Sequence, residues 1–393
     1  MLDIPALRSQ FPALSPIGGG PTRVWLDNAA TTFQPRGVIA AVSDYCERGH
    51  APAAATAIYA DARARVARAV GAADLGSVVF CAGATNAIHL VAAGWGEVNI
   101  AAGDEIIVSS AEHVANLACW QALTQRRGAR LRVIPVDRDG AFPVDALRQT
   151  LSRRTRLVAV AHVSNVSGAI FPVREIVAAA HAAGARVLVD GAQAVAHMAV
   201  EFDRIGADFY AFSGHKAFAP TGIGVLIGRT ECLQALQPVL LGANAFDAFA
   251  LENAPLAPVP GRLEGGTANI AGAVALAAAL EFVERLGRDD VAEHERQLCA
   301  RLDAGLAHID GVTQLGSSRN RVGIRAFVVD GRDSFDIQRG LQDHSVAIRA
   351  GHLSAQTLLR QFDTKHALRA SVAVYNDTDD IDRFIAALAA GVR

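Results

Sequence analysis

The sequence predicts an α/β protein built around a mostly parallel sheet, followed by a second, smaller α/β region. From about residue 78, short β-branched runs alternate with alanine-rich helical stretches. Two more apolar runs before residue 230 stand too close together for a helix to connect them. Another set of strands and helices comes after a long helical pattern that begins beyond Thr267. Such an alternating order is typical of a sheet that helices cover on both faces.

The strand candidates of the larger sheet follow one another between residues 78 and 228. Helical periodicity fills most of the intervals between the first five, which are VVF at Val78, EIIVS at Glu105, RLRVIPV at Arg130, RLVAVAHV at Arg156 and RVLVD at Arg186. The last two, FYAFSGH from Phe209 and GVLIG from Gly224, are expected to form an antiparallel hairpin. The sheet is therefore predicted to be mixed.

From residue 244 onward the sequence no longer shows the regular alternation of strands and helices. Residues 244–262 are rich in alanine, proline and phenylalanine without a clear period, which indicates a loop or an interface segment. The run IAGAVALAAALEFV from Ile270 is too short to span a membrane and indicates a buried helix. Strand candidates RVGIRAFVV at Arg321 and VAIRAG at Val346, with a final helix from Asp379, make up the second α/β region.

Composition excludes several classes of function. The chain has 393 residues, 51% of them apolar and 19% charged, and a formal net charge of -2 with both signs interspersed. Neither nucleic-acid binding nor attraction to anionic lipid is expected, and the N-terminus lacks the pattern of a signal peptide. The five cysteines, Cys46, Cys81, Cys119, Cys232 and Cys299, form no CxxC pair or metal-binding cluster. We therefore expect reduced core thiols, no metal site and a cytoplasmic protein.

Polar residues collect where the predicted strands end, which is where ligands bind in open α/β sheets. Lys216 follows one buried strand, and a buried ammonium group needs a partner. Asp190 ends another strand, with Gln193 one turn further on, and His113 follows a third. The segment CAGATNAIHL places Thr85 at a strand-to-helix turn, where free N–H groups and the helix dipole favour a phosphate.

Each of these residues, taken alone, has a structural explanation. Thr85 has the pattern of an ordinary N-cap, Asp190 that of a carboxylate paired with a structural arginine, and His113 that of a structural histidine. Together, a lysine, a buried aspartate, an anion-binding turn and a flat imidazole match what pyridoxal 5'-phosphate requires. The lysine forms a Schiff base, the aspartate keeps the pyridine nitrogen protonated, and the turn holds the phosphate. The sequence therefore predicts a pyridoxal 5'-phosphate site.

Seven segments resemble the cysteine desulfurase group of the class V aminotransferases, in the order of that family. They are LDNAATTFQP at Leu26, EHVANLACWQ at Glu112, HVSNVSGAIFPV at His162, VDGAQA at Val189, FSGHKAFAPTGIGVL at Phe212, GGTANIAGAVALAAALEF at Gly265, and RAGHLSAQ with LRASVAVYN from Arg349. The resemblance implies the fold type I of pyridoxal-phosphate-dependent transferases, with a seven-stranded, mostly parallel sheet in a large cofactor-binding domain. It also implies a homodimer with the active site at the subunit interface. We place the large domain at residues 20–275 and the small domain at 1–19 and 276–393, with the N-terminal segment packing on the C-terminal domain.

The resemblance also implies a role for each matching residue. Lys216 is the Schiff-base lysine and proton shuttle, and His113 stacks on the cofactor ring. Asp190 pairs with the pyridinium nitrogen, and Gln193 reaches the phenolic oxygen. The positions that contact the cofactor phosphate are Ala84, Thr85, Ser213, His215 and, from the second subunit, Thr267. The residues that hold an amino-acid carboxylate are Asn165, which also lies beside the cofactor, Arg349 and Arg369. A guanidinium grips a carboxylate bidentately, although a surface ion pair is the alternative for either arginine.

Three positions depart from the family pattern. Ser354 stands where desulfurases of this type carry the cysteine that takes up sulfur, and a serine hydroxyl cannot hold a persulfide. Alanines at residues 53–57 replace a histidine- and arginine-containing stretch, which suggests a wider or altered pocket. Ala84 lacks the second hydroxyl that the family offers to the phosphate.

These departures leave four functions open for a small amino-acid substrate. The first is a cysteine-independent lyase that eliminates sulfur, selenium or sulfinate from the β-carbon. The others are an aminotransferase or another pyridoxal reaction, a true desulfurase with a cysteine brought in from elsewhere, and a non-catalytic cofactor-binding partner. The intact Lys216, Asp190 and His113 argue against the last.

Overall fold

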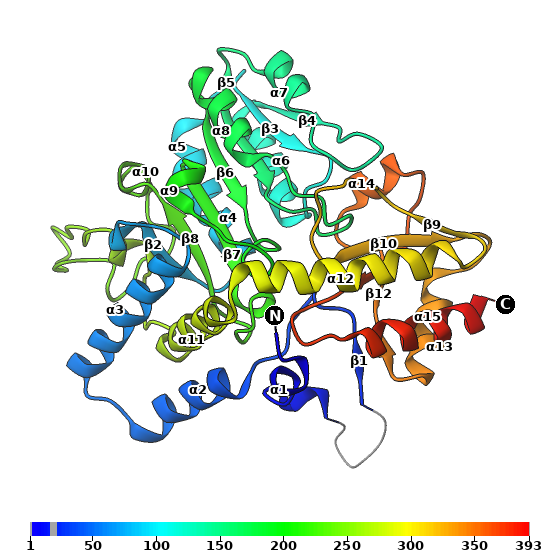
Figure 1. Cartoon of the computed structure of the whole chain (residues 1–393). Helices are drawn as coiled ribbons and strands as arrows, with labels where there is room; N and C mark the ends of the chain where they lie inside the picture. Colours follow the sequence, from blue (N-terminus) through cyan, green and yellow to red (C-terminus); the bar gives the residue numbers. More distant parts are fainter. Residues whose placement is uncertain (1, 16–21, 393) are drawn as a thin grey trace.

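A computed structural model describes residues 2–15 and 22–392 and contains a seven-stranded sheet and a smaller four-stranded sheet (Figure 1). The strands of the larger sheet, in spatial order, are β2 (Val78–Cys81), β8 (Gly224–Gly228), β7 (Phe209–Ser213), β6 (Arg186–Asp190), β5 (Thr155–Ala161), β3 (Glu105–Ser109) and β4 (Arg130–Ile134). Only β8 runs against its neighbours β2 and β7, and the other pairs are parallel. The predicted mixed sheet and its closing hairpin are confirmed.

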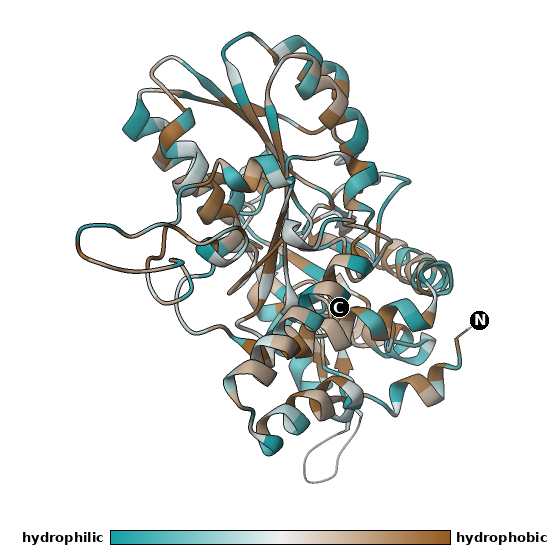
Figure 2. Cartoon of the chain, turned by 90° about the vertical axis from the view of Figure 1, so that its left-hand side faces the viewer, coloured by the Kyte–Doolittle hydropathy of each residue, from teal (hydrophilic) through white to brown (hydrophobic). Residues whose placement is uncertain are grey.

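Except for the edge strand β4, the strands of this sheet are largely buried on both faces, and their successive side chains enter two different cores. In β6, Leu188 belongs to the core that also contains residues of α4 (Ala84–Val91) and α6 (Ala115–Arg127). Val187 and Val189 belong to the opposite core, which also contains residues of α3 (Pro52–Ala69), α8 (Val173–Ala182), α11 (Ile270–Leu286) and other helices. Hydrophobic colouring accordingly runs along the central strands in Figure 2. With both faces covered, the ends of the strands are the places left for a site.

The C-terminal region forms a four-stranded antiparallel sheet, in the order β12 (Arg349–Gly351), β13 (Ala367–Ser371), β10 (Ile324–Val329) and β9 (Val312–Gln314). Its helices are α12 (Arg288–Ala307), α13 (Ser334–Asp343), α14 (Gln356–Gln361) and α15 (Thr378–Val392). The expected strand VAIRAG is divided into β11 (Val346–Ala347) and β12, because β11 pairs with β1 (Val24–Trp25) instead. The sequence did not predict β1, β9 or β13. The division into two domains stays a prediction, and its limit at residues 19 and 20 lies outside the described residues.

The remaining elements are short or connect the two regions. They are α1 (Ile4–Arg8), α2 (Arg36–Arg48), α5 (Glu97–Asn99), α7 (Val144–Thr150), α9 (Phe202–Ile205), α10 (Thr230–Gln234), a π-helical turn at Ala92–Gly96, and 3₁₀ turns at Pro12–Leu14, Leu75–Ser77, Gly214–Lys216 and Gly261–Leu263. Most of residues 244–262 form an irregular loop, as expected, which projects from the left of the molecule in Figure 1. Phe249 and Leu251 in this loop are 68% and 92% exposed. No helix among the described residues is long and apolar enough to cross a membrane.

The cysteines only partly follow the expectation of core thiols. Cys119, Cys232 and Cys299 are buried and Cys81 is half-buried. The expectation is wrong for Cys46, which is exposed because α2 buries only Val38 among its side chains.

Candidate active site

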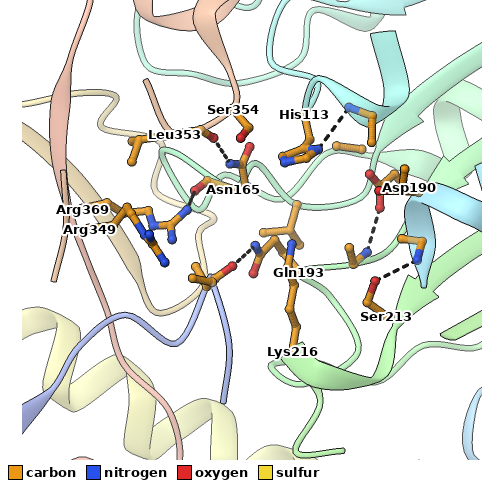
Figure 3. A pocket seen from close by; sticks show the side chains of 18 of the residues that line it. His113, Asn165, Asp190, Gln193, Ser213, Lys216, Arg349, Leu353, Ser354 and Arg369 are labelled. Atoms are coloured by element: carbon orange, nitrogen blue, oxygen red, sulfur yellow. Dashed lines mark hydrogen bonds between the residues drawn. The ribbon is translucent and has the colours of Figure 1, made fainter. Parts of the chain in front are cut away.

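One cavity of about 500 Å³ brings together almost every residue that the sequence singled out (Figure 3). It lies between the carboxyl ends of strands in the larger sheet and strands β12 and β13 of the smaller one. The predicted residues that line it are Ala84, Thr85, His113, Asn165, Asp190, Gln193, Ser213, His215, Lys216, Arg349, Ser354 and Arg369. Thr267 does not line it.

Lys216 lies in the 3₁₀ turn that follows β7. Removal from water and the nearby Arg369 lower the pKa of its amine to about 8, while Asp190 acts in the opposite direction. With this pKa, about a tenth of the amine is uncharged at pH 7, and the uncharged amine is the form that attacks an aldehyde.

Asp190 is the last residue of β6, and its side chain is buried. Its Oδ1 accepts a hydrogen bond from the Ala192 N–H at 3.0 Å. Burial raises the pKa of this carboxyl group, which the Ala192 N–H and Lys216 only partly offset. No cation among the described residues forms an ion pair with Asp190. The carboxylate thus has room for a cationic partner supplied by a ligand.

His113 follows β3 and presents a neutral ring. Its Nδ1 accepts a hydrogen bond from the Ala115 N–H at 3.1 Å. Burial, Lys216 and Arg369 lower the imidazole pKa to about 4, in that order of importance. At neutral pH the ring is therefore uncharged and suited to stacking on another flat ring.

The turn between β2 and α4 packs closely against the ends of β7 and β8. Ser213 Oγ accepts from the Ala84 N–H at 2.8 Å. At Gly224 a Cβ atom would lie 2.5 Å from the Cα of Gly83, so only glycine permits this approach. The turn presents the N-terminus of α4 and the Thr85 side chain to the cavity, an arrangement that favours an anion.

Arg349 and Arg369 stand directly opposite each other on β12 and β13. Asp27, a residue the sequence prediction missed, accepts from both: Oδ2 lies 2.8 Å from Arg349 Nη2, and Oδ1 lies 3.1 Å from Arg369 Nη2. Arg369 Nη1 donates to the Asn165 carbonyl oxygen at 3.0 Å, and its Nε is buried without a partner. The residues predicted to hold the carboxylate therefore lie together, and their binding role stays a prediction. The signal for Asp27 was its place in the segment LDNAATTFQP.

Asn165 and Gln193 both donate to backbone oxygens at the rim of the cavity. Asn165 Nδ2 donates to the Leu353 carbonyl at 2.8 Å, and Gln193 Nε2 to the Ala29 carbonyl at 2.8 Å. Asn165 Oδ1 is buried without a partner. This oxygen is free to accept a hydrogen bond from a bound molecule.

The loop that carries Ser354 has a constrained backbone. Leu353 and Ser354 both have positive φ angles, 51° and 52°, which side chains with a Cβ rarely adopt. The Ser354 carbonyl accepts from the Val114 N–H at 2.7 Å, and the Ser354 N–H donates to His352 Nδ1 at 2.9 Å. None of the five cysteines lines the cavity. That Ser354 replaces a relay cysteine stays a prediction.

Two other predicted features lie elsewhere. Thr267 lines a second cavity of about 490 Å³, together with Cys81 and Glu264, so its role across a subunit interface stays a prediction. The alanines at residues 53–57 lie in the first turns of α3 and do not line the active-site cavity of this chain. The idea that they widen this pocket has no support within one chain.

Comparison with known proteins defines the class of this protein. Residues 24–384 match the family model of the class-V aminotransferases, and the chain belongs to this family. It is 40% identical over 395 residues to a cysteine desulfurase of Synechococcus elongatus, covering 98% of this chain and 63% of that protein. It is 39% identical over 397 residues to a probable cysteine desulfurase of Vibrio cholerae, covering 99% of this chain and 98% of that protein. The chain thus spans less than two thirds of the Synechococcus relative.

Solved structures agree with this class. The cysteine desulfurase CsdA of Escherichia coli superposes with a TM-score of 0.93 and 33% identity, covering 100% of this chain and 99% of the other. A mutant of C-DES, with glycine linked covalently to its pyridoxal phosphate cofactor, superposes with a TM-score of 0.84 and 25% identity, covering 97% and 98%. The chain is a cysteine desulfurase-like member of a pyridoxal-phosphate-dependent family.

The residues present fit this cofactor. Asp190 is a buried carboxylate without a cationic partner among the described residues, Asn165 has an unpaired buried oxygen, and the turn before α4 offers an anion site. Lys216 lies in the same cavity with a lowered pKa. Lys216 would hold the aldehyde carbon, Asp190 the ring nitrogen and the turn the phosphate.

Proposed function

We propose that the protein cleaves the carbon–sulfur bond of a cysteine-type amino acid, with L-cysteine as the first substrate to test. The observation that carries this proposal is the single cavity that combines Lys216 and Asp190 with the arginine pair, in a chain whose relatives are named cysteine desulfurases. These names support the desulfurase alternative more than the cysteine-independent lyase that the sequence first suggested.

The arginine pair binds and orients the substrate. Arg349 and Arg369 have N–H groups available for the α-carboxylate, and Asn165 fixes Arg369 through its carbonyl oxygen. A carboxylate held there would fix one end of the amino acid inside the cavity that Lys216 also lines.

Lys216 is the residue that transfers the proton of the substrate α-carbon. Pyridoxal phosphate, when bound, supplies an aldehyde that joins an amine and a ring that accepts electrons from a bond at the α-carbon. The lowered pKa of Lys216 lets Nζ remove a proton from the substrate α-carbon and return it. Asp190 would hold the ring nitrogen of the cofactor, and the neutral His113 imidazole would adjoin the ring without adding charge to the site.

The fate of the sulfur separates two candidate reactions. Desulfuration of L-cysteine gives L-alanine and passes the sulfur to a thiol, and that thiol must come from outside this cavity because no cysteine lines it. The second candidate, elimination without a cysteine, gives pyruvate, ammonia and a sulfur-containing leaving group. It is favoured by Ser354 in the loop and by the likeness to C-DES, which another structure names a cystine C–S lyase bound to its product cysteine persulfide.

Product analysis tests the proposal. The holoenzyme is incubated with L-cysteine, L-cystine, cysteine sulfinate and L-selenocysteine, with and without added thiol, and L-alanine, pyruvate and sulfide are measured. L-Alanine that depends on added thiol supports desulfuration, and pyruvate without thiol supports the lyase. Conversion to a keto acid that needs a second keto acid for turnover would point instead to an aminotransferase. No product from any sulfur substrate would overturn the proposal.

We also propose that the functional unit is a homodimer located in the cytoplasm. Thr267 lies away from the active-site cavity of its own chain, and Leu240, Leu241, Phe249 and Leu251 are more than 60% exposed. Apolar side chains exposed to this degree support a covered surface in the assembly. The cytoplasmic location rests on five cysteines without a pairing pattern.

A further inference from the structure

Asp27 links the two arginines of the carboxylate subsite, and no role has yet been assigned to it. Building on the proposed function, we propose that Asp27 is a specificity residue, which sets the charge of the arginine subsite so that it favours a single carboxylate group over a compact dianion, such as oxalate, bound at the same place.

The position of Asp27 is fixed by the fold. It follows β1 and forms a bridge to Ser371 at the end of β13. The neighbouring Asn28 side chain donates to the Ser371 carbonyl at 2.7 Å and to Asn376 Oδ1 at 3.1 Å. The Asp27 side chain is only 7% exposed. The fold thus places the Asp27 carboxylate between the two arginines.

The arginines need a negative charge between them. Arg349 and Arg369 are cross-strand partners, and like charges directly opposite each other on a sheet repel. Asp27 accepts from one nitrogen of each guanidinium group, at 2.8 and 3.1 Å. It leaves the buried Nε of Arg369 without a partner, which marks a place where a ligand oxygen can bind.

The charge count gives the selectivity. Two guanidinium groups and one carboxylate have a net charge of +1, from +2 and −1. One substrate carboxylate brings the cluster to neutrality, whereas a dianion leaves an excess negative charge next to Asp27. Without the Asp27 charge the cluster would have a charge of +2, which matches a dianion. In the limited solvent at this site, one extra unit charge a few ångströms away changes affinity on the order of tenfold or more.

The test measures anion binding to the holoenzyme by isothermal titration calorimetry, with acetate and oxalate as probes. In Asp27→Asn we expect the affinity for oxalate, relative to acetate, to increase at least tenfold over the wild type. Asp27→Glu restores the charge and should keep the relative affinity close to the wild-type value. An unchanged ratio in folded Asp27→Asn overturns the proposal.

The chain offers a matched control. Asp303 also pairs with two arginines, at 3.0 Å from Arg321 and 2.7 Å from Arg325, but none of the three lines the active-site cavity. Asp303→Asn removes the same charge and should leave the oxalate-to-acetate ratio unchanged. An equal change in both variants would show that overall charge, and not Asp27, sets the ratio.

A second variant covers the case in which Asp27→Asn does not fold. Arg349, whose side chain is 47% exposed, can be replaced with little risk to the core, and Arg349→Gln lowers the cluster charge from +1 to 0. Oxalate should then lose more affinity than acetate, and equal losses would contradict the charge argument. Calorimetry requires no turnover, so these results can be read even if the protein does not cleave cysteine.

Discussion

Lys216 shows how one side chain acquires its chemistry from its surroundings. An exposed lysine is almost fully charged near neutral pH, but burial and the nearby Arg369 lower the pKa of this amine to about 8. The group then titrates close to physiological pH, where it can act as a nucleophile and as a proton carrier.

The rate at which the apoenzyme takes up pyridoxal phosphate should therefore depend on pH. The reactive form of Lys216 is the neutral amine, so the rate should rise by about tenfold per pH unit below 8 and level off above it. Stopped-flow absorbance between pH 6 and 9.5 measures this profile. A midpoint near 10.5, the ordinary value for a lysine, would show that the site does not lower the pKa.

Replacing Lys216 should remove covalent attachment and catalysis together. In Lys216→Ala we expect no adduct after borohydride reduction and a loss of turnover of at least about 100-fold, because a positioned proton carrier typically contributes that much to the rate. Mass spectrometry of the reduced wild-type protein should place the adduct on Lys216. An adduct on Lys365, the other lysine in the chain, would disprove the assignment.

Ser354 should contribute much less than Lys216. Its hydroxyl lines the cavity and can contact substrate or water, and one neutral hydrogen bond contributes about 0.5–1.5 kcal/mol. Ser354→Ala should therefore lower kcat/KM by about tenfold or less. A loss as large as that of Lys216→Ala would show that Ser354 takes part in the chemistry. In Ser354→Cys, a persulfide on the new thiol would show that this position reaches the substrate sulfur.

At the level of elements, the anion site depends on the close contact between β8 and the turn before α4. Gly224 leaves space for that turn, because a Cβ atom there would meet Gly83 at 2.5 Å and the Phe212 carbonyl oxygen at 2.6 Å. The same contact holds the Ala84 N–H against Ser213. The phosphate site is thus built by backbone packing as well as by side chains.

Gly224→Ala should displace this turn and weaken cofactor binding. Overpacking of this kind costs about 1–3 kcal/mol, and we expect both a lower melting temperature and a higher dissociation constant for pyridoxal phosphate. Gly340→Ala is the control, since a Cβ there meets nothing within 4 Å and the residue lies in α13. Unchanged cofactor affinity in Gly224→Ala would mean that the turn tolerates the shift.

At the level of the whole molecule, two features lie outside the active-site cavity: the second cavity, which Thr267 lines, and the exposed loop within residues 244–262. Thr267 lines that cavity, while Phe249 and Leu251 expose large apolar surfaces in the loop. Neither feature has an evident use within one chain, and both are consistent with a contact between copies.

Sedimentation velocity at micromolar concentration should show a dimer. A permanent interface of this kind buries roughly 2,000 Å² or more, so the dimer should persist on dilution. Phe249→Asp with Leu251→Asp places two charges in the exposed loop and should promote dissociation. Val98→Asp, at a 60% exposed residue outside that loop, is the control for added charge. A wild-type monomer with full activity would contradict the dimer proposal.

The larger sheet could be predicted from the amino-acid sequence, and so could most of the residues that line the candidate cavity. Apolar runs predicted all seven strands of that sheet; six of them are largely buried, and only the edge strand β4 is mostly exposed. Lys216, Asp190 and His113 could be predicted because ligand groups gather at strand ends, a rule that depends only on local order. The resemblance added the two arginines, which lie far from Lys216 in the sequence.

Three short strands and the role of Asp27 became visible only in the tertiary structure. β1 and β9 have only two and three residues, and β1 and β13 pair with strands that lie further away in the chain, so no local pattern marks them. Asp27 joins Arg349 and Arg369 across more than 300 residues, and its role depends on the charge of both partners. The sequence shows that residue 27 is an aspartate, but only the folded chain shows which positive charges lie next to it, because those charges come from distant segments.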